Sequence, residues 1–114
     1  MLNHVVLLKF KPGIEESDIT KLEELLDDLP NKISEILVYE FGRNTIPSEQ
    51  AYDFAIVSLF ANPETLERYR THPDHLKVLG LIKGVSENII TTDFMGSDAS
   101  SIKEKTPGMG IPDF

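Results

Sequence analysis

The segment richest in titratable side chains is residues 69–75, YRTHPDH, which holds one tyrosine and two histidines. The whole chain has only three histidines and three tyrosines, so this segment is the first candidate for chemistry. A neutral imidazole can remove a proton from a carbon next to a carbonyl group, and a phenol can hydrogen-bond the enolate that develops. Tyr69 and His75 are therefore candidates for an acid–base pair. Pro73 predicts a helix junction at His72, because the residue before a proline is disfavoured in a helix.

The strands that would position these side chains follow from short apolar runs bounded by turn residues. Strands are predicted at residues 4–11, 35–42, 51–60 and 87–94. Helices are predicted at residues 17–30, 63–71 and 73–84. The resulting order, β-α-β-β-α-β, is that of an α+β, ferredoxin-like fold. We therefore expect an antiparallel four-stranded sheet with the helices on one face.

The ends of the predicted helices carry recognisable capping residues. Ser17 or Asp18 is the expected cap of the first helix, which we expect to end at Pro30. Asn62 followed by Pro63 predicts the start of the second helix, because asparagine caps well and proline suits the first helical position. The first and second helices are thus each predicted from both periodicity and a capping signal.

Both faces of the predicted sheet carry apolar residues. In the third strand Phe54 and Ile56 point to one side, whereas Val57 and Leu59 point to the other. Two helices can cover one face only, and monomers rarely leave a contiguous apolar patch of several hundred Å² exposed. We therefore expect a homodimer in which the bare sheet faces pack together about a two-fold axis. The alternative is that the C-terminal tail folds back over the sheet.

Composition limits the class of protein and of partner. The 114 residues predict one domain at 1–95 and a Gly/Ser/Pro-rich tail at 96–114, packed on itself or on the partner subunit. A net charge of −8 argues against nucleic acid and against anionic membranes as partners. No apolar run is long enough to span a bilayer, and no cofactor-binding motif is present, so we expect no cofactor. The absence of cysteine fits a cytoplasmic location.

Four segments of the sequence resemble the stress-responsive A/B barrel domain (Dabb) family. They are HVVLLKFK at 4–11, FGRN at 41–44, YDFAIVSLFANPETLERYRTHPDH at 52–75 and TTDF at 91–94. The resemblance covers about residues 3–95 and implies a dimeric α+β barrel. The family includes olivetolic acid cyclase, which closes a ring by aldol condensation without a cofactor. Similarity to that cyclase implies working residues at His4, Tyr69 and His75, and it associates Asp93 with the same pocket.

The predicted elements bring these candidates to one place, between the sheet and the helices. His4 shares a strand face with Val6 and Leu8, which we assign to the helix side. We expect His75 to act as the base, Tyr69 as the acid or oxyanion donor, and His4 as a helper. The residues expected to contact a ligand are Asp93, Phe54, Ile56 and Leu79.

Three interpretations of this cluster stay open. The first is a homodimeric barrel of unknown biochemical role, whose buried polar cluster is structural or binds a small organic molecule. The second is a cofactor-independent enzyme of cyclase or lyase type that uses Tyr69 and His75. The third is a zinc site formed by His4, His72 and His75, although Pro73 breaks the helix that would align the last two.

Overall fold

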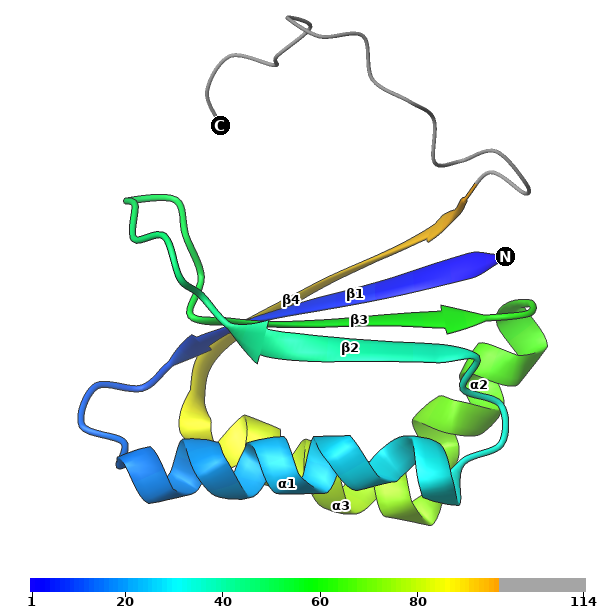
Figure 1. Cartoon of the computed structure of the whole chain (residues 1–114), viewed down its shortest axis with the longest axis horizontal. Coiled ribbons are helices and arrows are strands. Elements are labelled where there is room, and N and C mark those ends of the chain that lie inside the picture. Colours follow the sequence, from blue (N-terminus) through cyan, green and yellow to red (C-terminus); the bar gives the residue numbers. More distant parts are fainter. Residues whose placement is uncertain (97–114) are drawn as a thin grey trace, which may run out of the picture.

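Four strands and three helices make up the part of the chain that the structure describes, residues 1–96 (Figure 1). In this computed structural model the elements are β1 (Leu2–Phe10), α1 (Glu16–Lys32), β2 (Val38–Arg43), β3 (Phe54–Phe60), α2 (Pro63–Thr71), α3 (Pro73–Val85) and β4 (Ser86–Met95). The predicted tail lies outside the described residues, apart from Gly96. Its packing and the domain boundary therefore stay predictions.

The four strands form one antiparallel sheet in the order β2-β3-β1-β4. All three helices lie on the same side of this sheet (Figure 1). The predicted ferredoxin-like fold is confirmed. In the register of the central strand, His4 of β1 lies between Ser58 of β3 and Asp93 of β4. The sheet thus places a histidine and a carboxylate from opposite ends of the chain next to each other.

The core lies between the three helices and the helix-facing side of the sheet. Leu22 and Leu26 of α1 and Leu8 of β1 have no exposed surface. Leucines at this spacing fall on one face of a helix, so burying that face fixes how α1 lies on the sheet. Each fully buried leucine contributes about 2 kcal/mol of hydrophobic stabilisation.

The boundaries of α1 differ from the prediction at both ends. Glu15 caps the helix in place of Ser17 or Asp18, and its backbone N–H donates to the Asp18 carboxylate over 3.2 Å. The helix also continues two residues past Pro30. A proline in the last turn removes one backbone donor only, and the Ile33 N–H closes the helix on the Leu29 carbonyl at 2.9 Å.

Strands β2 and β3 begin three residues later than predicted. Before β2, the Ile36 N–H donates to the Ile33 carbonyl at 3.3 Å, which makes a turn of a segment predicted as strand. Before β3, the Asp53 carboxylate accepts the Phe10 N–H at 2.8 Å and so ties the end of the β2–β3 loop to β1. This loop rises on the side of the sheet opposite to the helices (Figure 1).

The junction between α2 and α3 is the one predicted from the sequence. The Asn62 side chain accepts the Thr65 N–H at 2.9 Å and caps α2. His72 ends α2 and begins α3: its N–H donates to the Tyr69 carbonyl at 3.1 Å, and its Nδ1 accepts the Asp74 N–H at 3.1 Å. A single residue therefore joins two helices that both face the sheet.

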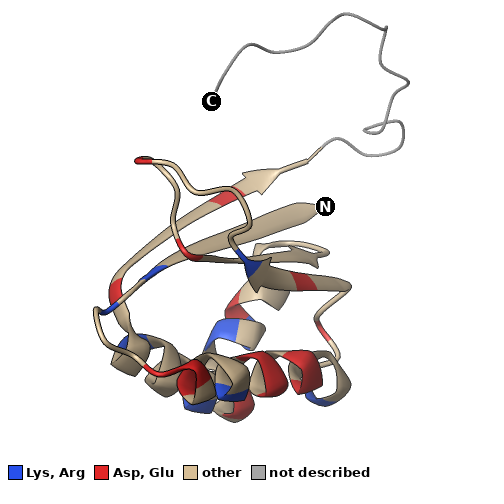
Figure 2. Cartoon of the chain, turned by 60° about the vertical axis from the view of Figure 1, so that its left-hand side comes forward, with Lys and Arg blue, Asp and Glu red and all other residues tan. Residues whose placement is uncertain are grey.

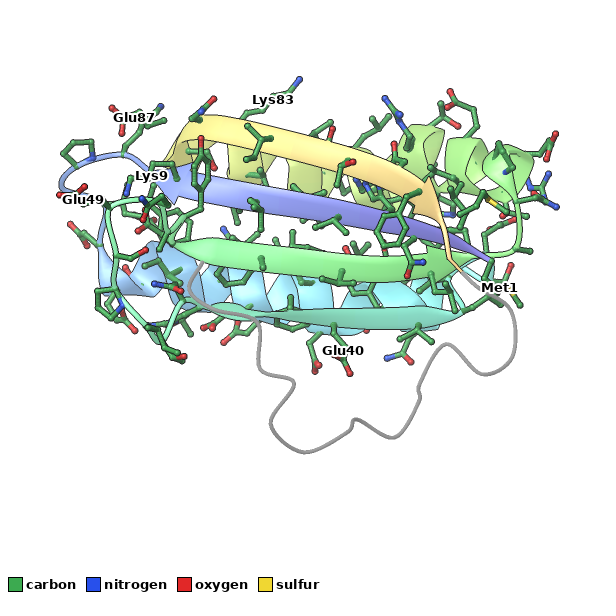
Figure 3. All side chains as sticks on the ribbon, turned by 90° about the horizontal axis from the view of Figure 1, so that it is seen from above. Met1, Lys9, Glu40, Glu49, Lys83 and Glu87 are labelled. Carbon is green, nitrogen blue, oxygen red and sulfur yellow. The ribbon has the colours of Figure 1, made fainter. Side chains whose placement is uncertain are left out.

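The side of the sheet without helices, which we call the open sheet face, is largely apolar. Its apolar side chains come from alternate positions of all four strands, as the register requires: Val5, Leu7, Val38, Ala55, Val57, Leu59, Ile90 and Phe94. Val57 is 41% exposed and Phe94 is 51% exposed. Figure 2 shows that charged positions gather mainly on the helices and loops. Figure 3 views the open sheet face directly. The structure confirms that both faces of the sheet carry apolar residues.

Within residues 1–96, none of the helices has the length and apolar character that a membrane crossing requires.

Candidate functional site

A cavity of about 310 Å³ lies between the helix-facing side of the sheet and helices α2 and α3. Aliphatic residues of β1, β3, β4 and α3 form much of its wall, and polar groups come from every lining element except β3. The lining residues are His4, Val6, Ile56, Glu67, Tyr69, Arg70, Thr71, His75, Leu79, Ile82, Ile89 and Thr91. This composition is typical of sites for small organic molecules, which are mostly apolar with a few placed polar groups.

Five of the seven predicted site residues meet at this cavity: His4, Tyr69, His75, Ile56 and Leu79. Asp93 does not line it but hydrogen-bonds His4 from the neighbouring strand. The structure does not bring Phe54 to the cavity. Its side chain is 1% exposed, and its ring packs against Phe10 and Phe41 in the core.

His75 is held in one tautomer by the backbone of α2. Its Nδ1 lies 3.0 Å from the Arg70 carbonyl oxygen, which can only accept a hydrogen bond, so Nδ1 carries the hydrogen. In the neutral ring this leaves a lone pair on Nε2. Burial lowers the pKa of His75 below its ordinary value and outweighs the hydrogen bond to the Arg70 carbonyl, which acts in the opposite direction. At neutral pH the ring is therefore uncharged and can accept a proton.

His4 is a buried histidine with a carboxylate partner. Asp93 lies directly opposite it in the β1–β4 register, and the His4 Nδ1 and an Asp93 carboxylate oxygen form a hydrogen bond. In the neutral imidazole the lone pair is then on Nε2, as for His75. The ring also makes an edge-on contact with Tyr69, with 6.2 Å between centroids. His4 thus contacts both the ring of Tyr69 and the Asp93 carboxylate of β4.

Tyr69 lies between the two histidines. Its ring centroid is 4.3 Å from that of His75. Burial raises the pKa of its hydroxyl to about 12, so the proton stays on the oxygen at neutral pH. Tyr69 can therefore donate a hydrogen bond to an oxygen atom of a ligand.

Tyr39 of β2 is a site residue that sequence reasoning missed. Its hydroxyl lies 2.8 Å from the hydroxyl of Tyr69, although Tyr39 does not itself line the cavity. The period-two pattern of the strand placed Tyr39 on the same side as Phe41. That pattern could not show that α2 would bring Tyr69 over this position.

The polar residues of α2 at the cavity, Glu67, Arg70 and Thr71, were also missed. All three are exposed, and in the sequence they read as the solvated side of a helix. Their role at the cavity depends on how α2 is tilted against the sheet, which periodicity alone does not give.

His72 does not line the cavity, because its Nδ1 is used to cap α3. Among residues 1–96, no three His, Cys, Asp or Glu side chains are grouped so that they could hold a metal ion. The three-histidine arrangement considered for zinc is therefore not formed in this part of the chain.

Acidification is expected to destabilise the fold through His75. Its pKa is lowered in the folded state, so as the pH falls through about 6.5 the unfolded chain binds the proton first. Folding stability is therefore fully present above about pH 6.5, and it is lost progressively until the pH falls through the lowered pKa. Urea unfolding from about pH 7 to about pH 5 should show a smaller loss in the His75→Asn variant than in the wild type. Equal losses in the two proteins would contradict this.

Comparison with known proteins gives consistent matches over the described part of the chain. The family model described as "Stress responsive A/B Barrel Domain" matches residues 2–96. The stress-response A/B barrel domain-containing protein HS1 of Arabidopsis thaliana is 24% identical over 101 residues, covering 87% of this chain and 93% of HS1.

Two solved structures give the same fold. A dimeric ferredoxin-like protein of unknown function from Thermobifida fusca has a TM-score of 0.75 at 25% identity, covering 82% of this chain and 88% of that one. The hydroxynitrile lyase of Passiflora edulis has a TM-score of 0.75 at 17% identity, covering 93% of this chain and 96% of the lyase. At that identity the second likeness concerns the fold alone.

Proposed function

The chain belongs to the stress-responsive A/B barrel domain family, and from this premise we propose that it is a homodimer that binds a small organic molecule in each protomer. The ligand would be largely apolar and would carry a carbonyl group. It would lie in the cavity between the sheet and helices α2 and α3, and no cofactor is needed for this role.

The observation that carries the proposal is the combination of an aliphatic cavity with one polar cluster in its wall. The cavity has about 310 Å³ of space, at the lower end of the range usual for small-molecule sites. Tyr69 supplies a hydroxyl donor, and His75 supplies a lone pair on Nε2. A carbonyl compound with an aromatic or aliphatic body complements both kinds of surface.

The homodimer is supported by the open sheet face. An apolar sheet surface with Val57 and Phe94 about half exposed is more than a monomer usually leaves in water. Solved relatives at 25% and 27% identity are described as dimeric ferredoxin-like proteins. We assign the dimer contact to this face, because the helices already cover the other.

A second candidate function is cofactor-independent proton transfer, which the tautomer of His75 favours. The His75 Nε2 would take a proton from the carbon next to the ligand carbonyl. The electron pair of that C–H bond would form a C=C bond to the carbonyl carbon, and the π pair of the C=O bond would move onto the oxygen. The Tyr69 hydroxyl would stabilise the resulting enolate by donating a hydrogen bond. The name of the Passiflora edulis structure indicates that this fold can carry lyase chemistry.

Filling the cavity tests the binding site. Leu79→Trp should weaken the binding of acetophenone, a small aryl ketone, at least about tenfold, because the indole would occupy the space of the ligand. Affinity can be measured by titration in two-dimensional ¹H–¹⁵N NMR. The matched control is Leu76→Trp on the same helix, since Leu76 is 51% exposed and does not line the cavity. No shift of cavity residues in the wild type, or equal weakening in the two variants, would count against the proposal.

A further inference from the structure

The hydroxyl groups of Tyr39 and Tyr69 form a pair in which either oxygen could donate. The two residues differ in their surroundings. Tyr69 lines the cavity, whereas Tyr39 stands behind it, on the helix-facing side of β2 opposite Ser58. The direction of this hydrogen bond decides what the cavity presents to a ligand.

The surroundings favour Tyr39 as the donor. Within residues 1–96 the Tyr39 hydroxyl bonds only that of Tyr69 and does not line the cavity, so the Tyr69 oxygen is the one acceptor that the described residues offer its hydrogen. Tyr69 has the cavity beside it and can direct its own hydrogen there. Burial raises the pKa of Tyr69, and the hydrogen bond from Tyr39 acts in the opposite direction, as expected when that oxygen accepts.

We propose that Tyr39 is a positioning residue: its hydroxyl donates to the Tyr69 oxygen and thereby turns the Tyr69 hydrogen into the cavity. The cavity then offers one donor, the Tyr69 hydroxyl, and one acceptor, the His75 Nε2. Their rings are close, with centroids 4.3 Å apart. The site selects ligands that carry an accepting oxygen next to an acidic hydrogen, which describes enolisable ketones and related carbonyl compounds.

This selectivity rests on the proposed binding function, but the hydrogen bond between the two hydroxyls can be tested without a ligand. Tyrosines labelled with ¹³C at Cζ give one NMR signal per residue, and this carbon responds to hydrogen bonds at its oxygen. Tyr39→Phe should shift the Tyr69 signal. Tyr52→Phe should leave it in place, because the Tyr52 hydroxyl bonds Asn88 away from the cavity.

The binding test uses two probes of nearly the same shape, acetophenone and α-methylstyrene, which has a CH₂ group in place of the carbonyl oxygen. The wild type should prefer acetophenone. Tyr39→Phe should weaken acetophenone binding by about three- to tenfold and leave α-methylstyrene binding unchanged, since one hydrogen bond loses its orientation.

The outcomes separate a failure of the role of Tyr39 from a failure of the proposed binding function. An unmoved Tyr69 signal in Tyr39→Phe, with acetophenone still bound, would overturn the role of Tyr39 alone. Equal weakening of both probes would overturn it too, because that is the effect of a packing defect. If neither probe binds the wild type, the proposed function and the selectivity fail together, while the ¹³C signal still tests the hydrogen bond between Tyr39 and Tyr69.

Discussion

Replacing Val57 with glutamate is expected to convert the proposed dimer into monomers. Val57 lies on β3, next to Glu40 of β2 and Val5 of β1 on the open sheet face. A glutamate there would be buried in the dimer beside another carboxylate, and a two-fold axis would introduce it twice. Since burying an unpaired charge costs several kcal/mol, the dissociation constant should rise by about a hundredfold or more. Sedimentation at micromolar concentration would measure this.

The monomer fold should tolerate the change, because Val57 is already 41% exposed within one protomer. The matched control is Leu76→Glu on α3, where a leucine of similar exposure lies on the opposite side of the molecule. This control should remain dimeric. A wild-type protein that sediments as a monomer, or a Val57→Glu protein that stays dimeric, would remove the open sheet face as the interface.

Removing the imidazole of His75 is expected to abolish most of any proton-transfer activity. The test reaction is exchange of the methyl hydrogens of acetophenone for deuterium, which needs the base step alone and can be followed by ¹H NMR. His75→Ala should slow the catalysed exchange by about a hundredfold or more, within the range of a general base. The rate should be constant at neutral pH and fall as the pH drops through the lowered pKa of His75, because only the neutral ring is a base.

His72→Asn provides the control for this variant. His72 lies three residues away and caps α3 through its side chain, and asparagine is itself a good helix cap. The control should keep both the fold and the exchange rate. Exchange that is absent in the wild type would remove the catalytic function and leave binding. An equal rate in His75→Ala would show that another group is the base.

The fold could be predicted well from the sequence because its main signals are local. Asn62, Pro63 and the His72–Pro73 step gave the limits of α2 and the start of α3. The errors fell where a tertiary contact overrides a local preference. The turn at Ile33–Ile36 and the hydrogen bond from Phe10 to Asp53 shorten two predicted strands.

The candidate site could be predicted in part. Strand alternation and helix spacing were enough to bring His4, Tyr69 and His75 to one side of the sheet. Tyr39 was missed, since its contact with Tyr69 depends on how α2 crosses β2 and β3. Phe54 was assigned to the wrong surroundings. It lies on the helix side of the sheet, as expected, but it is the first residue of β3, where its ring packs against Phe10 and Phe41.

The double use of His72 as the end of one helix and the start of the next has a consequence for the order in which the site assembles. Tyr69 and His75 are six residues apart and flank this junction, so their mutual geometry is local and can form as soon as the two helices do. His4 and Asp93 are 89 residues apart in the sequence and meet only when β1 pairs with β4. Contacts of such long sequence separation form slowly in folding. The hydrogen bond between His4 and Asp93 therefore indicates complete folding. A chain in which β1 and β4 have not yet paired lacks the carboxylate partner of His4.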